Sequence, residues 1–180
     1  RQVRQLLAFF KNYVPGFARC HLLSVAAQTG VRESRRIEGR ETLTAEQVLN
    51  NASHPESVAM CAFPIDIHDP AGSELNWVRK EKVCCYDIPY GVMVPVKFHN
   101  LLVTGRCISA THEALASARI TVTAMALGEA AGTAAALCAK SGADVDGADV
   151  AAVQAALAAR GAALVRLRQP VAVSRRAKRA

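Results

Sequence analysis

The chain has 180 residues and a formal net charge of +7, with 51% hydrophobic and 21% charged residues. This balance excludes an intrinsically disordered protein, and the length corresponds to about one globular domain. No run of about 18 apolar residues is free of polar interruptions, so we expect no membrane span, and no signal-peptide pattern is present.

The first segment is predicted to be a helix. Apolar residues recur at helical spacing from Val3 to Val14, and Pro15 ends the pattern. Because the chain starts at Arg1 directly on this pattern, we expect a truncated N-terminus. The apolar run from Leu22 to Ala27 then predicts a short buried strand.

A segment dense in charge follows and contains Arg32, Arg35 and Arg36. Guanidinium groups pair with carboxylates in a bidentate geometry, which makes Arg32 and Arg35 candidates for binding an anionic substrate. Salt bridges to neighbouring glutamates explain the pattern equally well. Beyond this segment, Thr44 to Gln47 has the pattern of a capping box and predicts a helix through Leu49.

The middle of the chain is predicted to be rich in strands. Residues 50–60 are typical of a polar connection, and the alternation from Phe63 to Pro70 predicts a strand. Two further strands are predicted over Val83–Tyr86 and Gly91–Val96, where the prolines favour strand ends or edges. The continuous apolar run Leu101–Gly105 predicts a buried central strand.

After a connection, a long helix is predicted from near Arg119 to Ser141, with Gly142 at its end. Small residues recur every four positions, so one face of this helix carries almost no side-chain bulk. They are Ala124, Gly128, Gly132 and Ala136. The first turn carries no acidic residue, which leaves its N–H groups available to an anion. Tight packing of helix on sheet is an equally good explanation of the small residues.

The C-terminal region is predicted to end in a helix and a tail. Asp149 is a candidate N-cap for a helix from Val150 to Arg160. Residues 166–180 are basic and contain no aromatic side chain, which favours a solvated, disordered tail over an arm that binds nucleic acid. The six cysteines form neither a C-x-x-C pair nor an iron–sulfur spacing, so we expect reduced thiols in a cytoplasm and no metal site.

Several stretches together resemble a family of bacterial FAD-dependent oxidoreductases, within the flavoproteins that are similar to glutathione reductase. The matching stretches are Gly30–Ile37, Pro64–Pro70, Tyr86–Tyr90, Asn100–Ser117 and Met125–Ala135. They occur in the order of the family and cover roughly residues 1–165. Because Asn100–Ser117 and Met125–Ala135 form one continuing match, the resemblance rests on four separate matches and is specific.

The resemblance implies an α/β fold: the closing strand and helix of a Rossmann-like FAD domain, with part of a strand-rich substrate domain. Residues 1–98 would be the partial substrate or cap region with its N-terminal helix, and residues 99–165 would be the C-terminal part of the FAD domain. The residues expected at the cofactor are Arg106, Cys107, Ile108, Ser109, Arg119, Thr121, Val122 and Thr123. The intact enzyme would transfer a hydride or electrons between an unknown small-molecule substrate and FAD.

The chain contains no G-x-G-x-x-G, the motif that holds the FAD pyrophosphate in this fold. The resemblance therefore implies a separate N-terminal FAD-binding segment as a partner, without which the chain is expected to be inactive. A truncated, non-catalytic binding or scaffold remnant is the alternative. Some more distant relatives carry an iron–sulfur cluster, but the chain has no ligand motif for one.

Two histidines are candidates for proton transfer. His68 lies on the alternating stretch before Pro70 and could donate a proton near the flavin, although a packed or surface histidine is the more common role. His112 follows the stretch expected to line the flavin and could face the substrate. A loop histidine held by a hydrogen bond is an equally good explanation of His112.

Overall fold

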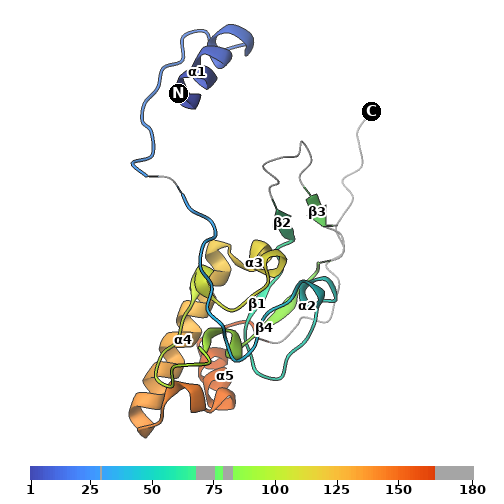
Figure 1. The fold of residues 1–180 in the computed structure, drawn as a ribbon, viewed down its shortest axis with the longest axis vertical. Helices are drawn as coiled ribbons and strands as arrows, with labels where there is room; N and C mark the ends of the chain where they lie inside the picture. Colours follow the sequence, from blue (N-terminus) through green and yellow to red (C-terminus); the bar gives the residue numbers. More distant parts are fainter. Residues whose placement is uncertain (29, 68–75, 79–82, 165–180) are drawn as a thin grey trace. The chain divides into compact units, whose positions relative to one another are not determined.

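Residues 1–31 and 32–180 form two separate units in a computed structural model of the chain (Figure 1). The structure describes residues 1–28, 30–67, 76–78 and 83–164. The basic tail and His68 lie outside the described residues.

The first unit contains the predicted N-terminal helix, α1 (Gln2–Tyr13). Lys11 lies in its last turn, where a cation stabilises the helix dipole. The ring of Phe10 stacks on that of Phe17, with 5.2 Å between centroids, and Phe9 contacts Phe10 and Tyr13. None of the residues of α1 is buried within the described part of the first unit.

The predicted strand at Leu22–Ala27 is wrong. Residues 21–26 have no regular structure, and Leu23 is 88% exposed. A strand is stable only when a neighbour accepts its backbone hydrogen bonds, and the first unit contains no second strand among its described residues. The apolar composition was therefore insufficient to predict a strand.

The second unit contains two small antiparallel sheets. Strand β1 (Ser57–Cys61) pairs with β4 (Tyr86–Pro89), with a register shift between Ser57 and Ala59. Strand β2 (Ile65–Ile67) pairs with β3 (Asn76–Val78). This mixture of helices and sheet is compatible with the α/β class, but no strand pair in the described part of the chain is parallel.

Several predicted strand boundaries require correction. Strand β2 confirms the middle of the stretch predicted from Phe63, whereas the supposed polar connection 50–60 contains the start of β1. The strands predicted over Val83–Tyr86 and Gly91–Val96 are replaced by β4 and a 3-10 helix, η1 (Tyr90–Met93). Residues of both elements are buried, so apolar composition could not distinguish a strand from a tight helical turn.

The buried strand predicted at Leu101–Gly105 is also wrong. Residues 101–104 have no regular structure, and Leu101 is 44% exposed. The Val103 N–H donates to the Met93 carbonyl at 2.9 Å, but no strand in the described part of the chain lies beside this segment. Gly105 then adopts a left-handed φ of 71° and begins the 3-10 helix η2 (Gly105–Cys107).

The helices agree better with the sequence. In α2 (Ala45–Leu49), the Thr44 hydroxyl accepts from the Gln47 N–H, and the Gln47 side chain accepts from the Thr44 N–H, which confirms the capping box. Helix α4 (Thr121–Ser141) ends at Gly142, which has a left-handed φ of 73°. Asp149 caps α5 (Val150–Ala159) by accepting from the Ala152 N–H.

One helix was missed. The predicted connection before α4 contains α3 (His112–Ala118), capped by the Thr111 hydroxyl, which accepts from the Ala114 N–H. The Ser117 hydroxyl in α3 donates to the carbonyl of Phe63 and lies 2.7 Å from the Tyr86 hydroxyl. Burial raises the pKa of Tyr86, so its phenol stays protonated in this network.

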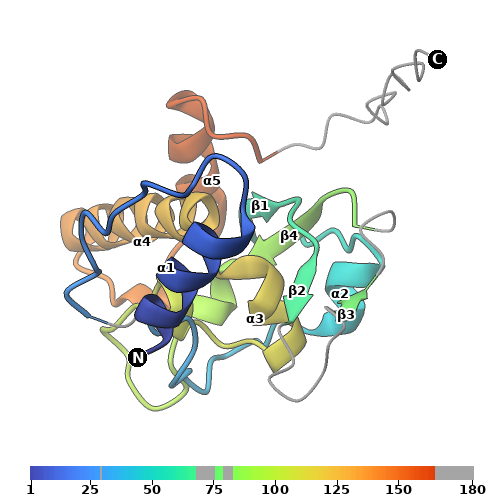
Figure 2. The same ribbon diagram turned by 90° about the horizontal axis from the view of Figure 1, so that it is seen from above.

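Helix α4 lies beside α5 and β1 in the core of the second unit (Figure 2). Leu127, Ala130 and Ala134 are completely buried on its inner side. Gly128 and Gly132 lie on its outer side, where a Cβ added to either residue would meet no atom within 4 Å. At these two positions the small-residue face is therefore not packed against the described part of the second unit.

Helix α4 is also long and apolar enough to cross a membrane, with a mean hydropathy of 1.4 in its most apolar window. This is weak evidence, because the core helix of a globular protein meets the same criterion. The inner side of α4 is packed into the core, and the absence of a membrane span stays a prediction.

A short 3-10 helix, η3 (Val145–Gly147), is tied to three distant segments. His99 Nδ1 lies 2.7 Å from Asp146 Oδ2, and Arg40 donates to the Asp146 carbonyl at 2.7 Å. The Tyr90 hydroxyl donates to the Val145 carbonyl. The hydrogen bond between His99 and Asp146 raises the pKa of the histidine and lowers that of the carboxyl.

Candidate functional site

A cavity of about 400 Å³ opens at the N-terminus of α4. Three arginines dominate its wall, and none of its described lining residues is acidic. The lining residues are Arg32, Gly105, Arg106, Arg119, Thr121 and Ala124. Sequence reasoning assigned Arg106, Arg119 and Thr121 to the cofactor and Arg32 to the substrate, and all four line this one cavity.

The local chain path explains why these residues meet. Arg119 directly follows α3, and α4 begins only two residues later, so Arg119 lines the cavity together with residues of the first turn of α4. The left-handed conformation of Gly105 begins η2, which contains Arg106 and packs against α4. The N-cap residue Ile120 has no side-chain hydrogen bond to offer, so the positive end of the helix dipole is not neutralised by a cap.

Glu33 connects the cavity wall to its surroundings. Its Oε2 pairs with Arg119 Nη1 at 3.4 Å, and its Oε1 lies 2.8 Å from His112 Nδ1 and 3.5 Å from Arg36 Nη1. Only 15% of the Glu33 side chain is exposed. Two arginines and one histidine therefore contact this one carboxylate, which fixes the position of Arg119.

Asp66 holds the other side of the arginine cluster. Arg119 Nη2 donates to the Asp66 carbonyl at 2.8 Å, and the Asp66 carboxylate pairs with Arg32 Nη1 at 3.9 Å. The two arginines differ in exposure, since the side chain of Arg119 is 13% exposed and that of Arg32 is 57% exposed. Arg119 is thus a fixed part of the wall, and Arg32 is an accessible cation at its edge.

His112 begins α3 and is half exposed. When its Nδ1 carries the proton donated to Glu33, Nε2 remains as the basic nitrogen. A carboxylate that orients an imidazole in this way is a common arrangement for proton transfer. Glu33 thereby links His112 to Arg119, although His112 does not line the cavity.

The remaining predicted cofactor residues are divided between surface and core. Cys107 and Val122 are exposed, and Val122 does not line the cavity. Ile108 is completely buried, and the buried Ser109 hydroxyl lies 2.9 Å from that of Thr42. Thr123 is also buried, with 2% exposure. The contact of these residues with a cofactor stays a prediction.

Arg35 and His68 are the two remaining candidates. Arg35 is exposed and does not line it. The catalytic role suggested for His68 falls outside the described residues. Within the described ranges, no group of three or more His, Cys, Asp and Glu residues could hold a metal ion. All six cysteines are free thiols.

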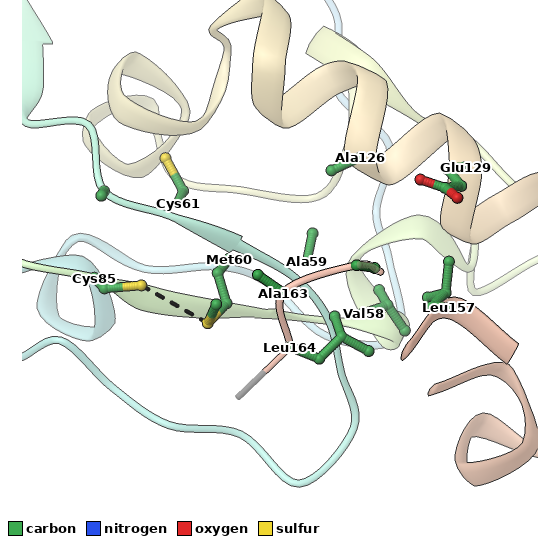
Figure 3. A pocket seen from close by; sticks show the side chains of 12 residues that line it. Val58, Ala59, Met60, Cys61, Cys85, Ala126, Glu129, Leu157, Ala163 and Leu164 are labelled. Atoms are coloured by element: carbon green, nitrogen blue, oxygen red, sulfur yellow. Dashed lines mark hydrogen bonds between the residues drawn. The ribbon is translucent and has the colours of Figure 1, made fainter. Parts of the chain in front are cut away.

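A second cavity, of about 350 Å³, lies between β1, α4, α5 and residues 162–164 (Figure 3). Its wall is almost entirely apolar, with Glu129 as the one charged residue among those that line it. The Cys85 thiol contacts the Met60 sulfur at 3.8 Å on this wall. This cavity offers little to orient a polar substrate, so the arginine-lined cavity is the better candidate site.

Sequence reasoning missed Glu33 and Asp66 as members of the site. Glu33 was considered only among the glutamates that form salt bridges with their neighbours, and Asp66 only as part of the strand predicted from Phe63 to Pro70. The signal in the sequence was a single acid among the arginines of residues 32–36. That pattern could not reveal Arg119 or His112 as partners, because both are about 80 residues away in the chain.

A comparison with protein-family models identifies the family of the chain. The model of the FAD dependent oxidoreductase family matches residues 1–157, which is most of the chain. No curated protein and no solved structure matches the chain. The match includes every residue that lines the arginine-rich cavity. The chain therefore belongs to the FAD-dependent oxidoreductase family.

Proposed function

We propose that this chain forms the C-terminal part of an FAD-dependent oxidoreductase that transfers a hydride or electrons between a small-molecule substrate and FAD. The observation that carries the proposal is the arginine-lined cavity at the start of α4, within a chain that matches the family over residues 1–157. The free cysteines are consistent with a cytoplasmic enzyme.

The residues of the cavity fit one end of FAD. Its wall is cationic, α4 begins without an acid or a capping side chain, and Ala124 adds little bulk. An electron-rich ring edge is stabilised by such surroundings. Arg106, Arg119 and Thr121 would hold this end, while the buried Ile108 and Ser109 would support the wall from behind.

The other end of FAD requires a partner segment. The chain has no G-x-G-x-x-G to surround a pyrophosphate. We therefore include in the proposal a separate FAD-binding segment that completes the site. FAD supplies the hydride or electron transfer when it is bound. This chain supplies the cationic wall and, through His112 oriented by Glu33, a group that can hold or release a proton.

A second candidate function is a binding or scaffold role without chemistry. The specific observation in its favour is the outer side of α4, where Val122 is 73% and Met125 is 69% exposed next to the open positions at Gly128 and Gly132. A surface of this kind suits contact with another protein segment. It does not explain why three arginines line one cavity.

The experiment that tests the proposal compares two carboxylates in the first turn of α4. In both Thr121→Asp and Val122→Asp, the new carboxylate should interact with the helix dipole and stabilise α4 by about 0.3–1 kcal/mol. Only Thr121 lines the cavity. In a complex of the chain with a family segment that carries G-x-G-x-x-G, Thr121→Asp should lower the reduction potential of the flavin or release FAD. Val122→Asp should match the parent in both measurements.

The chain without the partner segment is the second control. After incubation with excess FAD and desalting, it should be colourless, because the pyrophosphate site is missing. Equal potentials and equal FAD content in the parent and both variants would contradict the proposal and favour the scaffold role. A stoichiometric flavin spectrum from the chain alone would contradict the need for a partner segment.

A further inference from the structure

We propose that Arg32 holds an anionic group of the ligand, a carboxylate or a phosphate, in the cavity at the start of α4. The inference rests on the proposed function and specifies the chemistry of its ligand. It also identifies one arginine among the charged residues 32–36 as the residue that binds. The sequence had left Arg32 and Arg35 as equal candidates, with internal salt bridges as the alternative role.

Arg119 and Arg36, two arginines near Arg32, are held by contacts with other groups of the protein. Arg119 donates to the Asp66 carbonyl and pairs with Glu33, and only 13% of its side chain is exposed. Arg36 donates to the Ala110 carbonyl at 3.0 Å and also pairs with Glu33. Because each residue makes a hydrogen bond to a backbone carbonyl and an ion pair with Glu33, we assign both a structural role.

Arg32 is different. Within the described part of the chain its ion pair is with Asp66, and the 3.9 Å between Nη1 and Oδ2 is longer than a hydrogen bond. More than half of its side chain is exposed, and it lines the cavity. Its guanidinium can therefore donate two parallel hydrogen bonds to an anion without first breaking a hydrogen bond to Asp66.

The charges around the cavity favour an anion. Glu33 does not line the cavity, and its charge is compensated by Arg36 and Arg119. Asp66 faces Arg32 and also does not line the cavity. The arginines and the start of α4 therefore leave the wall positive, and a partly desolvated wall strengthens attraction to an anion.

The test measures binding of two probes to the 180-residue chain by isothermal titration calorimetry. Succinate represents a substrate carboxylate, and inorganic pyrophosphate represents the phosphates of a cofactor. Arg32→Gln should weaken binding of the matching probe by about tenfold, the loss typical of one hydrogen bond to a charged group. Arg35→Gln is the matched control. It removes the same charge three residues further along the chain, and the side chain of Arg35 does not line the cavity.

Arg32→Lys provides a second variant that keeps the charge. It should recover only part of the affinity, because lysine lacks the planar fork. The probe whose affinity depends on Arg32 identifies the source of the anion, substrate or cofactor. Parent-like affinity for both probes in Arg32→Gln would overturn the inference, as would an equal loss in Arg35→Gln. Neither probe contains flavin, so failure here is distinguishable from failure of the flavin experiment.

Discussion

Helices α1 and α4 show what a residue pattern can and cannot predict. Both helices form where the sequence predicted them, but none of the residues of α1 is buried, whereas α4 buries six side chains in the core of the second unit. The regular apolar spacing was clearer in α1 than in α4. Periodicity therefore predicts that a helix forms, and the presence of packing partners decides whether it contributes to a core.

The largest expected effect is on the free energy of unfolding, and it appears when leucine is replaced by alanine in the second unit but not in the first. Leu127 is completely buried, and Leu23 is 88% exposed. Leu127→Ala should lower the free energy of unfolding by about 2–5 kcal/mol, through lost burial and a cavity. Leu23→Ala should change it by less than about 0.5 kcal/mol. Urea denaturation followed by circular dichroism measures both, and a comparable loss in Leu23→Ala would reveal a packed environment around residues 22–25.

An intermediate effect is expected at Glu33, two residues after the boundary between the units. Glu33→Gln removes the charge that holds Arg119, Arg36 and His112, and should lower the free energy of unfolding by about 1–3 kcal/mol. Glu38→Gln is the control, since Glu38 is exposed. Equal stability of the two variants would mean that residues 32–37, like the exposed residues of the first unit, contribute little to the free energy of unfolding.

The smallest effect is expected from the exposed pair His99 and Asp146. Because the pKa of His99 is raised in the folded chain, the pair contributes stability below pH 6.5, the ordinary pKa of histidine. This contribution is lost as the pH rises through the pKa of His99 in the folded chain. The lowered pKa of Asp146 contributes above the ordinary value of 3.8 and is lost as the pH falls. The contribution of the pair should be largest between these two values.

Melting temperatures of the parent and Asp146→Asn across this range measure the effect. The difference between the two proteins should be greatest near pH 5 and should shrink at neutral pH. A difference that is constant from pH 4 to pH 8 would show that Asp146 acts through its backbone contacts with Arg40 and His99 rather than through its charge.

The features that the sequence predicted correctly depend on local chemistry. Thr44, Asp149 and Gly142 act within a few residues of their positions, so capping rules located α2, α5 and the end of α4. The family resemblance likewise depended on contiguous stretches of residues, and the family match confirms it. The cavity brings together four of the predicted site residues, although their contact with a cofactor stays a prediction.

The features that the sequence could not predict depend on distant partners. The run Leu101–Gly105 has the composition of a buried strand, but a strand requires a neighbour that composition does not specify. Arg32 and Arg35 are the same residue type three positions apart, and only the folded chain shows that one of them lines the cavity. Two of the three partners of Glu33, His112 and Arg119, are about 80 residues away in the chain, and no local pattern records such contacts.

The two glycines on the outer side of α4 have a thermodynamic consequence. Glycine within a helix is less favourable than alanine by about 0.8–1 kcal/mol, and a methyl group at Gly128 or Gly132 would meet no atom. Since folded domains are stable by only about 5–15 kcal/mol, this pair leaves an appreciable fraction of the available stability unused. The second unit on its own is therefore below the stability that its backbone would allow.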